Sequence, residues 1–156
     1  MLARLSMANT LEELPLYSKV LEFCDAVTAI LTRPALRRDR HLWGQIDDAN
    51  DSIDSNMQEG FEQPTDAAFA HYVFVAKGST AEVRTRLRRA QLKGHITLEE
   101  LQPIDAQGES LGKMMGGFIK YLLASGFTDR GRHAVAPRPP KRASPRHKQR
   151  RPIPDP

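Results

Sequence analysis

The 156-residue sequence has a single cysteine, Cys24, and only 6% aromatic residues. One cysteine excludes an intrachain disulfide and a cysteine-based metal site, and it fits a reducing compartment. No apolar run approaches the ~20 residues that span a bilayer, and the first ten residues lack the continuous apolar region of a signal peptide. We therefore expect a cytoplasmic protein that makes no membrane contact.

Motifs for catalysis or cofactor binding are also lacking. A di-metal site in a helix bundle needs Glu followed three residues later by His, and no glutamate here has histidine at that spacing. No phosphate-binding glycine-rich loop is present, and no nucleophile, base and orienting group stand at a recognisable spacing. We expect no metal, no cofactor and no enzymatic activity.

Charge is distributed unevenly along the chain. The sequence carries 23 Lys+Arg and 19 Asp+Glu, a net charge of +4. Residues 129–156 hold 9 of these cations and 2 of these acids, so their net charge is +7 and that of residues 1–128 is −3. Seven of the eleven prolines follow residue 136. Such a segment buries too little apolar area to offset its ordering entropy, which predicts a disordered basic tail over 127–156.

Apolar residues recur at alternating spacings of four and three in four segments, which is the pattern of amphipathic helices. These segments run from about Pro15 to before Pro34, from about Arg40 to Glu59, from Thr65 or Asp66 to Gly94, and from Thr97 to Ser125. With short connections and no strand-like pattern of useful length, they predict an all-α protein. We expect an antiparallel up-down four-helix bundle over 13–126, preceded by a flexible N-terminus over 1–12.

Local signals set the expected helix ends. Thr97 and Glu100 read as a capping box that starts the fourth helix. Pro103 follows closely, so a short first turn and a kink are expected there. Gly60 is placed to close the second helix in a left-handed conformation, and Gly94 to end the third.

Small and polar residues occupy positions in the second and third helices where a core would hold Leu or Val. They are Ser52, Asn56, Glu59, Gly60, Gly78, Ser79 and Glu82. Over about residues 11–123, the spacing of these groups resembles the bacterial four-helix bundle proteins encoded in intervening sequences of 23S ribosomal RNA genes. The accessory variability determinant proteins of diversity-generating retroelements resemble the same pattern.

The resemblance implies a homopentameric four-helix bundle. In the retroelement relatives, a basic ring surface is thought to meet nucleic acid and the reverse transcriptase. This chain departs from the pattern on its second helix, where Asp47, Asp48 and Asp51 stand in a region that is commonly basic in the family.

The polar motif has two interpretations. Asn56, Glu59, Ser79 and Glu82 could form a binding or catalytic cluster. Alternatively, they form a buried polar network that fixes helix register, with Gly78 and Ser79 allowing close backbone approach. We favour the structural interpretation, because buried polar groups must be paired and paired groups can specify one arrangement.

Two groups of cations are candidates for contact with nucleic acid. The first group lies near the end of the third helix, where cations also suit the helix dipole or could pair with Asp47, Asp48 and Asp51. Its members proposed for nucleic-acid contact are Arg84, Arg88, Arg89 and Lys93. The second group lies in the tail, where it could bind RNA or DNA or simply keep the chain soluble: Lys141, Arg142, Arg146, Lys148, Arg150 and Arg151.

These features favour a non-enzymatic, oligomeric accessory protein that binds nucleic acid or a nucleic-acid enzyme such as a reverse transcriptase. The alternative is a scaffold that recognises protein only, which the acidic residues of the second helix favour because they repel phosphate.

Overall fold

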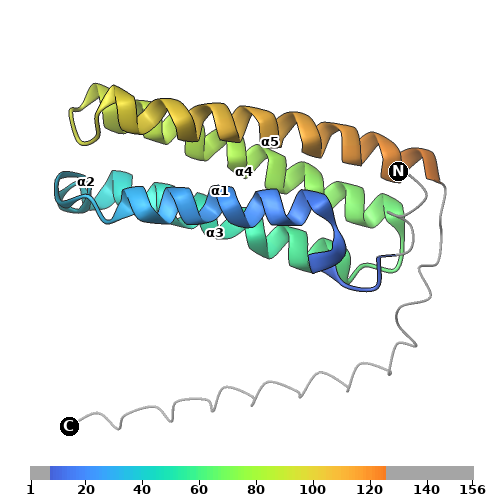
Figure 1. The fold of residues 1–156 in the computed structure, drawn as a ribbon. Coiled ribbons are helices and arrows are strands. Elements are labelled where there is room, and N and C mark those ends of the chain that lie inside the picture. Colours follow the sequence, from blue (N-terminus) through green and yellow to red (C-terminus); the bar gives the residue numbers. More distant parts are fainter. Residues whose placement is uncertain (1–7, 126–156) are drawn as a thin grey trace, which may run out of the picture.

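The structure is a computed structural model that describes residues 8–125, all of whose regular elements are helical. Its long helices are α1 (Pro15–Leu31), α3 (Arg40–Phe61), α4 (Asp66–Leu92) and α5 (Leu98–Ser125). They run antiparallel in two layers, α1 beside α3 and α4 beside α5 (Figure 1). Between the layers, α4 packs on α3 and α5 packs on α1. The predicted four-helix bundle is confirmed, while the predicted tail over 127–156 lies outside the described residues.

The predicted apolar stripes form the core. The residues at alternating spacings of four and three lie on one face of each helix and are buried there, whereas Leu21, beside the α1 stripe, is 38% exposed. They make one continuous hydrophobic cluster between the layers. Its largest fully enclosed members are Phe23, Phe69, Leu42, Ile46, Ile53, Met57, Leu87 and Met115.

Short elements that the sequence pattern did not predict complete the ends of the bundle. A 3-10 turn, η2 (Leu11–Glu13), precedes α1, and Ala8 and Leu11 are buried against the core. The folded unit therefore begins before residue 13, and residues 8–12 do not match the expected flexible terminus. A five-residue helix, α2 (Pro34–Arg38), links α1 to α3 and inserts Leu36 into the core.

The junction between α4 and α5 follows its sequence signals. Gly94 has a φ of 73°, and the N–H groups of Gly94 and His95 donate to the carbonyls of Gln91 and Ala90. This pair of bonds is a Schellman motif. Thr97 then caps α5: its hydroxyl accepts from Glu100 N–H at 3.2 Å, while the Glu100 carboxylate accepts from Thr97 N–H at 2.8 Å.

Pro103 does not divide α5, which runs as one helix from Leu98 to Ser125 (Figure 1). The turn before Pro103 is therefore continuous with the rest of the helix. The proline ring removes the hydrogen bond to the carbonyl of Glu99, an exposed residue whose carbonyl water can reach. Burial of Leu101 and Ile104 on either side holds the helix together across this gap.

Two glycines have roles other than those expected. Gly60 lies within α3 with helical φ, so it does not close the helix. A Cβ there would lie 2.6 Å from both the Phe69 ring and Tyr72 Cβ, so Gly60 lets α3 approach α4. Gly78 is exposed and a Cβ there would meet nothing within 4 Å, so its expected role in close approach is wrong within the described chain.

The two glycines allow a matched test of packing. Gly60→Ala should destabilise the protein by about 1–3 kcal/mol because the methyl overpacks the α3–α4 contact. Gly78→Ala should stabilise it by up to about 1 kcal/mol, because alanine is the better helix former and has room. Urea unfolding followed by circular dichroism measures both. Equal effects of the two changes would contradict this account.

Candidate functional site

A polar network joins α3 to α4 at the centre of the family-like motif. The hydroxyls of Ser52 and Ser79 lie 2.9 Å apart across the two helices. The Asn56 amide donates to the Ser52 carbonyl at 2.6 Å and to the Ser52 hydroxyl at 3.0 Å. All three side chains are half-buried and satisfied by one another. This arrangement fits the structural interpretation, in which the network fixes how α3 and α4 align.

The two glutamates of the motif do not join this network. The Tyr72 hydroxyl donates to Glu59 at 2.9 Å, and Arg86 donates to Glu82 at 3.3 Å on the same helix. Both glutamates are exposed, and their carboxylates contact Tyr72 and Arg86 rather than the serine and asparagine side chains. The expected four-residue cluster of Asn56, Glu59, Ser79 and Glu82 is therefore wrong.

A buried asparagine between α1 and α3 was missed by the sequence reasoning. Asn50 is 4% exposed, and its amide donates to the Cys24 carbonyl at 3.2 Å and to the Thr28 hydroxyl at 3.3 Å. Its side-chain oxygen is enclosed with no hydrogen-bond partner among residues 8–125. The signal was available, since Asn50 continues the Ile46–Ile53 stripe at spacings of four and three.

Acidic residues surround Cys24 on the α1–α3 layer. Burial, together with the nearby charges of Asp54, Asp25 and Asp51, raises the pKa of the Cys24 thiol to about 12. On α3, burial together with Asp51 and Asp48 raises the pKa of Asp47. This layer therefore carries a concentrated negative charge, and its thiol is protonated at neutral pH.

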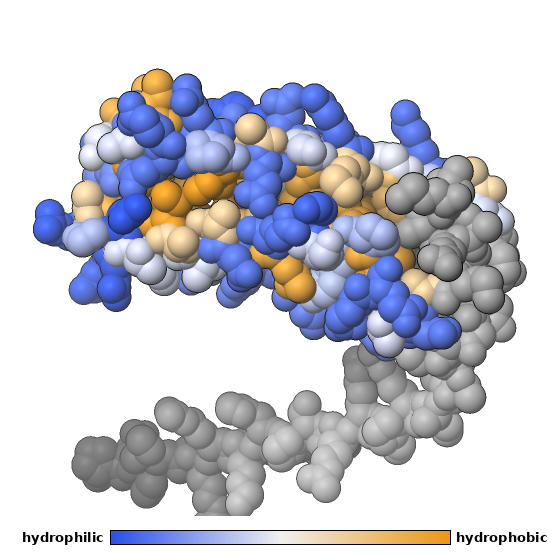
Figure 2. Space-filling model, in the orientation of Figure 1, coloured by the Kyte–Doolittle hydropathy of each residue, from blue (hydrophilic) through white to orange (hydrophobic). Residues whose placement is uncertain are grey.

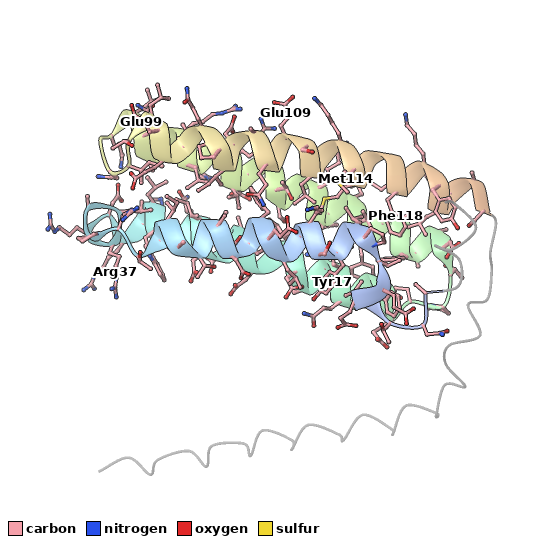
Figure 3. The ribbon with its side chains drawn as sticks, viewed as in Figure 1. Tyr17, Arg37, Glu99, Glu109, Met114 and Phe118 are labelled. Atoms are coloured by element: carbon pink, nitrogen blue, oxygen red, sulfur yellow. The ribbon has the colours of Figure 1, made fainter. Side chains whose placement is uncertain are left out.

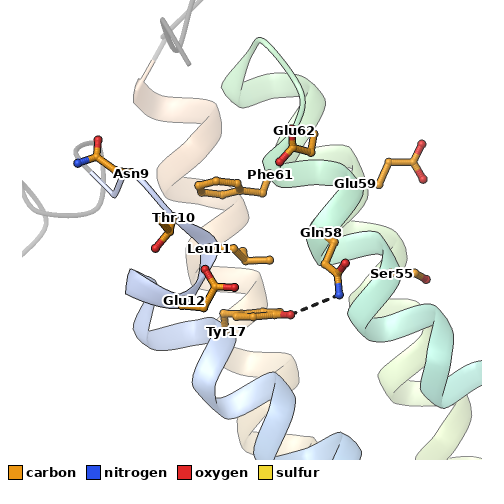
Figure 4. A pocket seen from close by; sticks show the side chains of 10 residues that line it. All are labelled: Asn9, Thr10, Leu11, Glu12, Tyr17, Ser55, Gln58, Glu59, Phe61 and Glu62. Carbon is orange, nitrogen blue, oxygen red and sulfur yellow. Dashed lines mark hydrogen bonds between the residues drawn. The ribbon is translucent and has the colours of Figure 1, made fainter. Parts of the chain in front are cut away.

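A cavity of about 650 Å³ opens at the start of α1 (Figure 4). The Tyr17 hydroxyl donates to Asp54 at 2.7 Å and accepts from Gln58 at 3.5 Å. Burial and the adjacent Asp54 raise the Tyr17 pKa to about 12, so the phenol stays protonated and is already engaged. The cavity is lined by Asn9, Thr10, Leu11, Glu12, Tyr17, Ser55, Gln58, Glu59, Phe61 and Glu62.

The cations near the end of α4 are largely paired with carboxylates of the same chain. Arg84 reaches Asp105 at 3.0 Å and Glu109 at 3.4 Å, and Arg88 reaches Asp105 at 2.8 Å. Burial acts to raise the pKa of Asp105, but the hydrogen bonds from the two arginines outweigh it, and the net shift is downward. The expected pairing is present, but its partners lie on α5 rather than at Asp47, Asp48 and Asp51.

Asp39 connects three parts of the fold at the α2 end of the bundle. Its side chain caps α3 by accepting from Leu42 N–H at 3.2 Å. It also accepts from Lys93 at 2.5 Å and lies 3.0 Å from His95 Nε2, so it joins α3 to the α4–α5 loop. Hydrogen bonds from Lys93 and His95, and then from Leu42, hold the Asp39 pKa far below its usual range.

Pairing leaves a different set of cations without an ionic partner within residues 8–125. Of the described residues that were predicted to contact nucleic acid, only Arg89 belongs to this set. The tail cations from Lys141 to Arg151 lie outside the described residues. Sequence reasoning missed the others, although Lys120 has no acidic residue three or four positions away. The set is Arg37, Arg38, Arg40, Lys77, Arg89 and Lys120.

Searches for two other kinds of site gave negative results over the described part of the chain. None of its helices is both long and apolar enough to cross a membrane. No cluster of three or more His, Cys, Asp or Glu side chains there could hold a metal ion.

Comparison with known proteins places the fold in a family. The model of the 23S rRNA-intervening sequence protein family matches residues 12–117, which is more than half of the chain. The chain belongs to this family. A crystal structure of a protein of unknown function from the S23 ribosomal protein family of Bacteroides thetaiotaomicron has a TM-score of 0.61 at 21% identity. The match covers 67% of this chain and 98% of that one, which supports the shared fold. A search of curated proteins gives no match.

The environment of Cys24 predicts an unreactive thiol. With a pKa of about 12, only about one thiol in ten thousand is ionised at pH 8, against roughly a quarter for an ordinary cysteine. Reaction of the native protein with a thiol-specific disulfide reagent should therefore be on the order of a thousandfold slower than reaction of the urea-unfolded protein. Comparable rates would contradict the buried placement of Cys24.

Asp39 predicts a specific loss of stability in acid. Folding lowers its pKa, so its contribution is complete above the unfolded-state value near 4 and declines as pH falls further. Asp39→Asn keeps the capping oxygen but removes the charge. Between pH 5 and pH 3, the urea midpoints of wild type and D39N should converge.

The interval starts at pH 5 so that histidine titration lies above it. Asp25→Asn is the control, since this exposed carboxylate has no hydrogen bond or ion pair within residues 8–125. A constant gap between wild type and D39N would show that the charge of Asp39 does not stabilise the fold.

Proposed function

We propose that this protein is a non-enzymatic, self-associating accessory protein of the cytoplasm that binds nucleic acid, or an enzyme acting on nucleic acid, through basic surfaces. A reverse transcriptase is the enzyme that the resemblance to retroelement accessory proteins implies. The main observation behind this proposal is the uneven charge of the chain: the net charge is +7 over residues 129–156 and −3 over the rest.

Ion pairing within the bundle supports a leading role for the tail. Arg84, Arg88 and Lys93 are held by Asp105, Glu109 and Asp39, and their charges are locally compensated. A polyanion would have to displace these carboxylates to reach the arginines and the lysine, so its binding would neutralise little additional positive charge. The tail has 9 cations and 2 acids, and such a segment binds phosphate without sequence preference by releasing condensed counterions.

Self-association would strengthen weak binding by individual tails. The resemblance implies a homopentamer, in which five tails would act on one strand at high effective concentration. Apolar side chains that reach the surface offer contact area for such an assembly, including Leu21 on α1 and Met114 on α5, each 38% exposed. Hydrophobic surface is visible along the seam between these two helices (Figure 2), where Met114 lies (Figure 3).

A scaffold that recognises only protein is the second candidate. The acidic α1–α3 layer favours it, because Asp47, Asp48 and Asp51 repel phosphate and suit a basic protein partner. Such a scaffold would bind no nucleic acid at any salt concentration.

Electrophoretic mobility shifts separate the two candidates. Full-length protein, treated with nuclease and repurified, is titrated into mixed RNA and DNA pools across a salt series beside a chain ending at Phe127. The shorter chain keeps every residue of the described core. We expect full-length binding to weaken steeply with salt, with a slope of about −0.7 per neutralised phosphate on single strands, and to be greatly weakened in the shorter chain.

The remaining outcomes are equally informative. Binding that is retained by the shorter chain would move the contact to the bundle. Binding that does not respond to salt would contradict the counterion-release account. Absence of binding by either chain would favour the protein scaffold.

A further inference from the structure

A groove of about 530 Å³ runs between α4 and α5 on the outer side of their layer. Its floor is formed by residues with little or no side chain, and a Cβ at Gly112 or Gly117 would meet nothing within 4 Å. Glu109, at its wall, points away from the α1–α3 layer (Figure 3). Its lining comprises Lys77, Thr80, Ala81, Arg84, Gly108, Glu109, Gly112, Lys113, Gly116, Gly117 and Lys120.

The groove is electropositive. Four of its lining residues are Lys or Arg, and its one carboxylate, Glu109, is already shared by Lys113 at 2.8 Å and Arg84 at 3.4 Å. Lys77 and Lys120 have no ionic partner within residues 8–125. The Lys77 amine projects over α5, since a Cβ on Gly116 would lie 3.3 Å from it. Two of the six cations without an ionic partner in the described chain therefore line the groove.

An exposed aromatic ring stands beside these lysines. Phe74 is 65% exposed and precedes Lys77 by one helical turn, on the stripe that continues through Ala81. Such a ring costs solubility and makes no ring contact among the described aromatic pairs. An aromatic face next to cations is the arrangement on which single-stranded bases stack while their phosphates are neutralised.

The exposed ring favours a single strand over a duplex. A base in a double helix is already stacked on its neighbours, whereas an unpaired base is free to stack on Phe74. Along the chain, α5 carries Lys113 and Lys120 and ends at Ser125, four residues before the net +7 segment begins.

We infer that the α4–α5 groove binds the phosphate backbone of a single-stranded nucleic acid through Lys77 and Lys120, with a base stacked on Phe74. This inference rests on the proposed function and names its site on the folded bundle. It also replaces Arg84, Arg88 and Lys93, whose charges are compensated, with residues that the sequence pattern did not single out.

The test uses the full-length chain and a fluorescent single-stranded RNA, with anisotropy measured across a KCl series. Lys77→Gln with Lys120→Gln removes two phosphate contacts, so the slope of log K against log salt should fall in magnitude by about 1.4 and the affinity at 0.15 M by roughly tenfold. Glutamine is about as good a helix former as lysine, so the exposed substitutions should leave unfolding unchanged.

Two further variants make the result specific. Arg37→Gln with Arg38→Gln removes the same charge from α2, where Arg37 lies at the opposite end of the bundle from Tyr17 (Figure 3), and should leave the slope unchanged. Phe74→Leu should weaken binding by roughly tenfold with no change in slope, because it removes stacking and no charge.

The outcomes distinguish this inference from the proposed function. If glutamine at the six tail cations, Lys141 to Arg151, abolishes binding while K77Q/K120Q matches the R37Q/R38Q control, the tail binds and the groove inference is overturned. If K77Q/K120Q lowers the mass of the assembly in light scattering but not RNA affinity, the groove holds a second copy of the chain instead. If the wild-type protein binds no RNA, both proposals fall.

Discussion

The close approach of α4 to both of its neighbours is the constraint on which the rest of the bundle depends. At Gly60 the α3 backbone meets the Phe69 ring, and at Gly108 a Cβ would lie within 2.8 Å of Phe23 and 2.9 Å of Arg84. Any larger side chain at either point would push helices apart and open the shared core. The same approach brings Ser52 to Ser79 and lays Arg84 across α5 to reach Asp105.

That geometry decides which charges are available to a partner. Arg84 and Arg88 share Asp105 because α5 places this carboxylate opposite both of them. The number of positive residues along α4 does not predict this pairing. Lys77 lies opposite Gly116, where α5 offers no side chain at all. Arg84 and Arg88 are thus compensated by α5, while Lys77 and Lys120 have no ionic partner within residues 8–125.

The parts of the fold that could be predicted are those encoded by neighbours in sequence. Four helices, their buried stripes, the Thr97–Glu100 capping box and the left-handed Gly94 follow from periodicity and local hydrogen bonding. The parts that could not be predicted depend on residues distant in the chain. Gly60 resembles a helix terminator until its contact with Phe69 is known, and Pro103 resembles a break until the buried residues around it are known.

The candidate site follows the same division. A polar network that included Asn56 and Ser79 was predicted because buried polar groups must find partners, and both join Ser52 in the structure. The absence of Glu59 and Glu82 from this network was not predicted, since it depends on how the two helices are oriented about their axes. Family resemblance located the motif but carried no information on Lys77 or Lys120, which lie outside it.

Screening of the acidic charges by salt would allow the bundle to bind a polyanion on its opposite face. The acidic residues near Cys24 belong to the α1–α3 layer, and the groove opens on the far side of the α4–α5 layer. With helix axes about 8–10 Å apart and an outer helix radius of about 5 Å on each side, the two outer faces are separated by roughly 20 Å. The Debye length at physiological salt is about 8 Å, so exposed charges on one face act weakly on a strand at the other. Repulsion from Asp51 and Asp54 therefore does not exclude the phosphate contact that we infer for the groove.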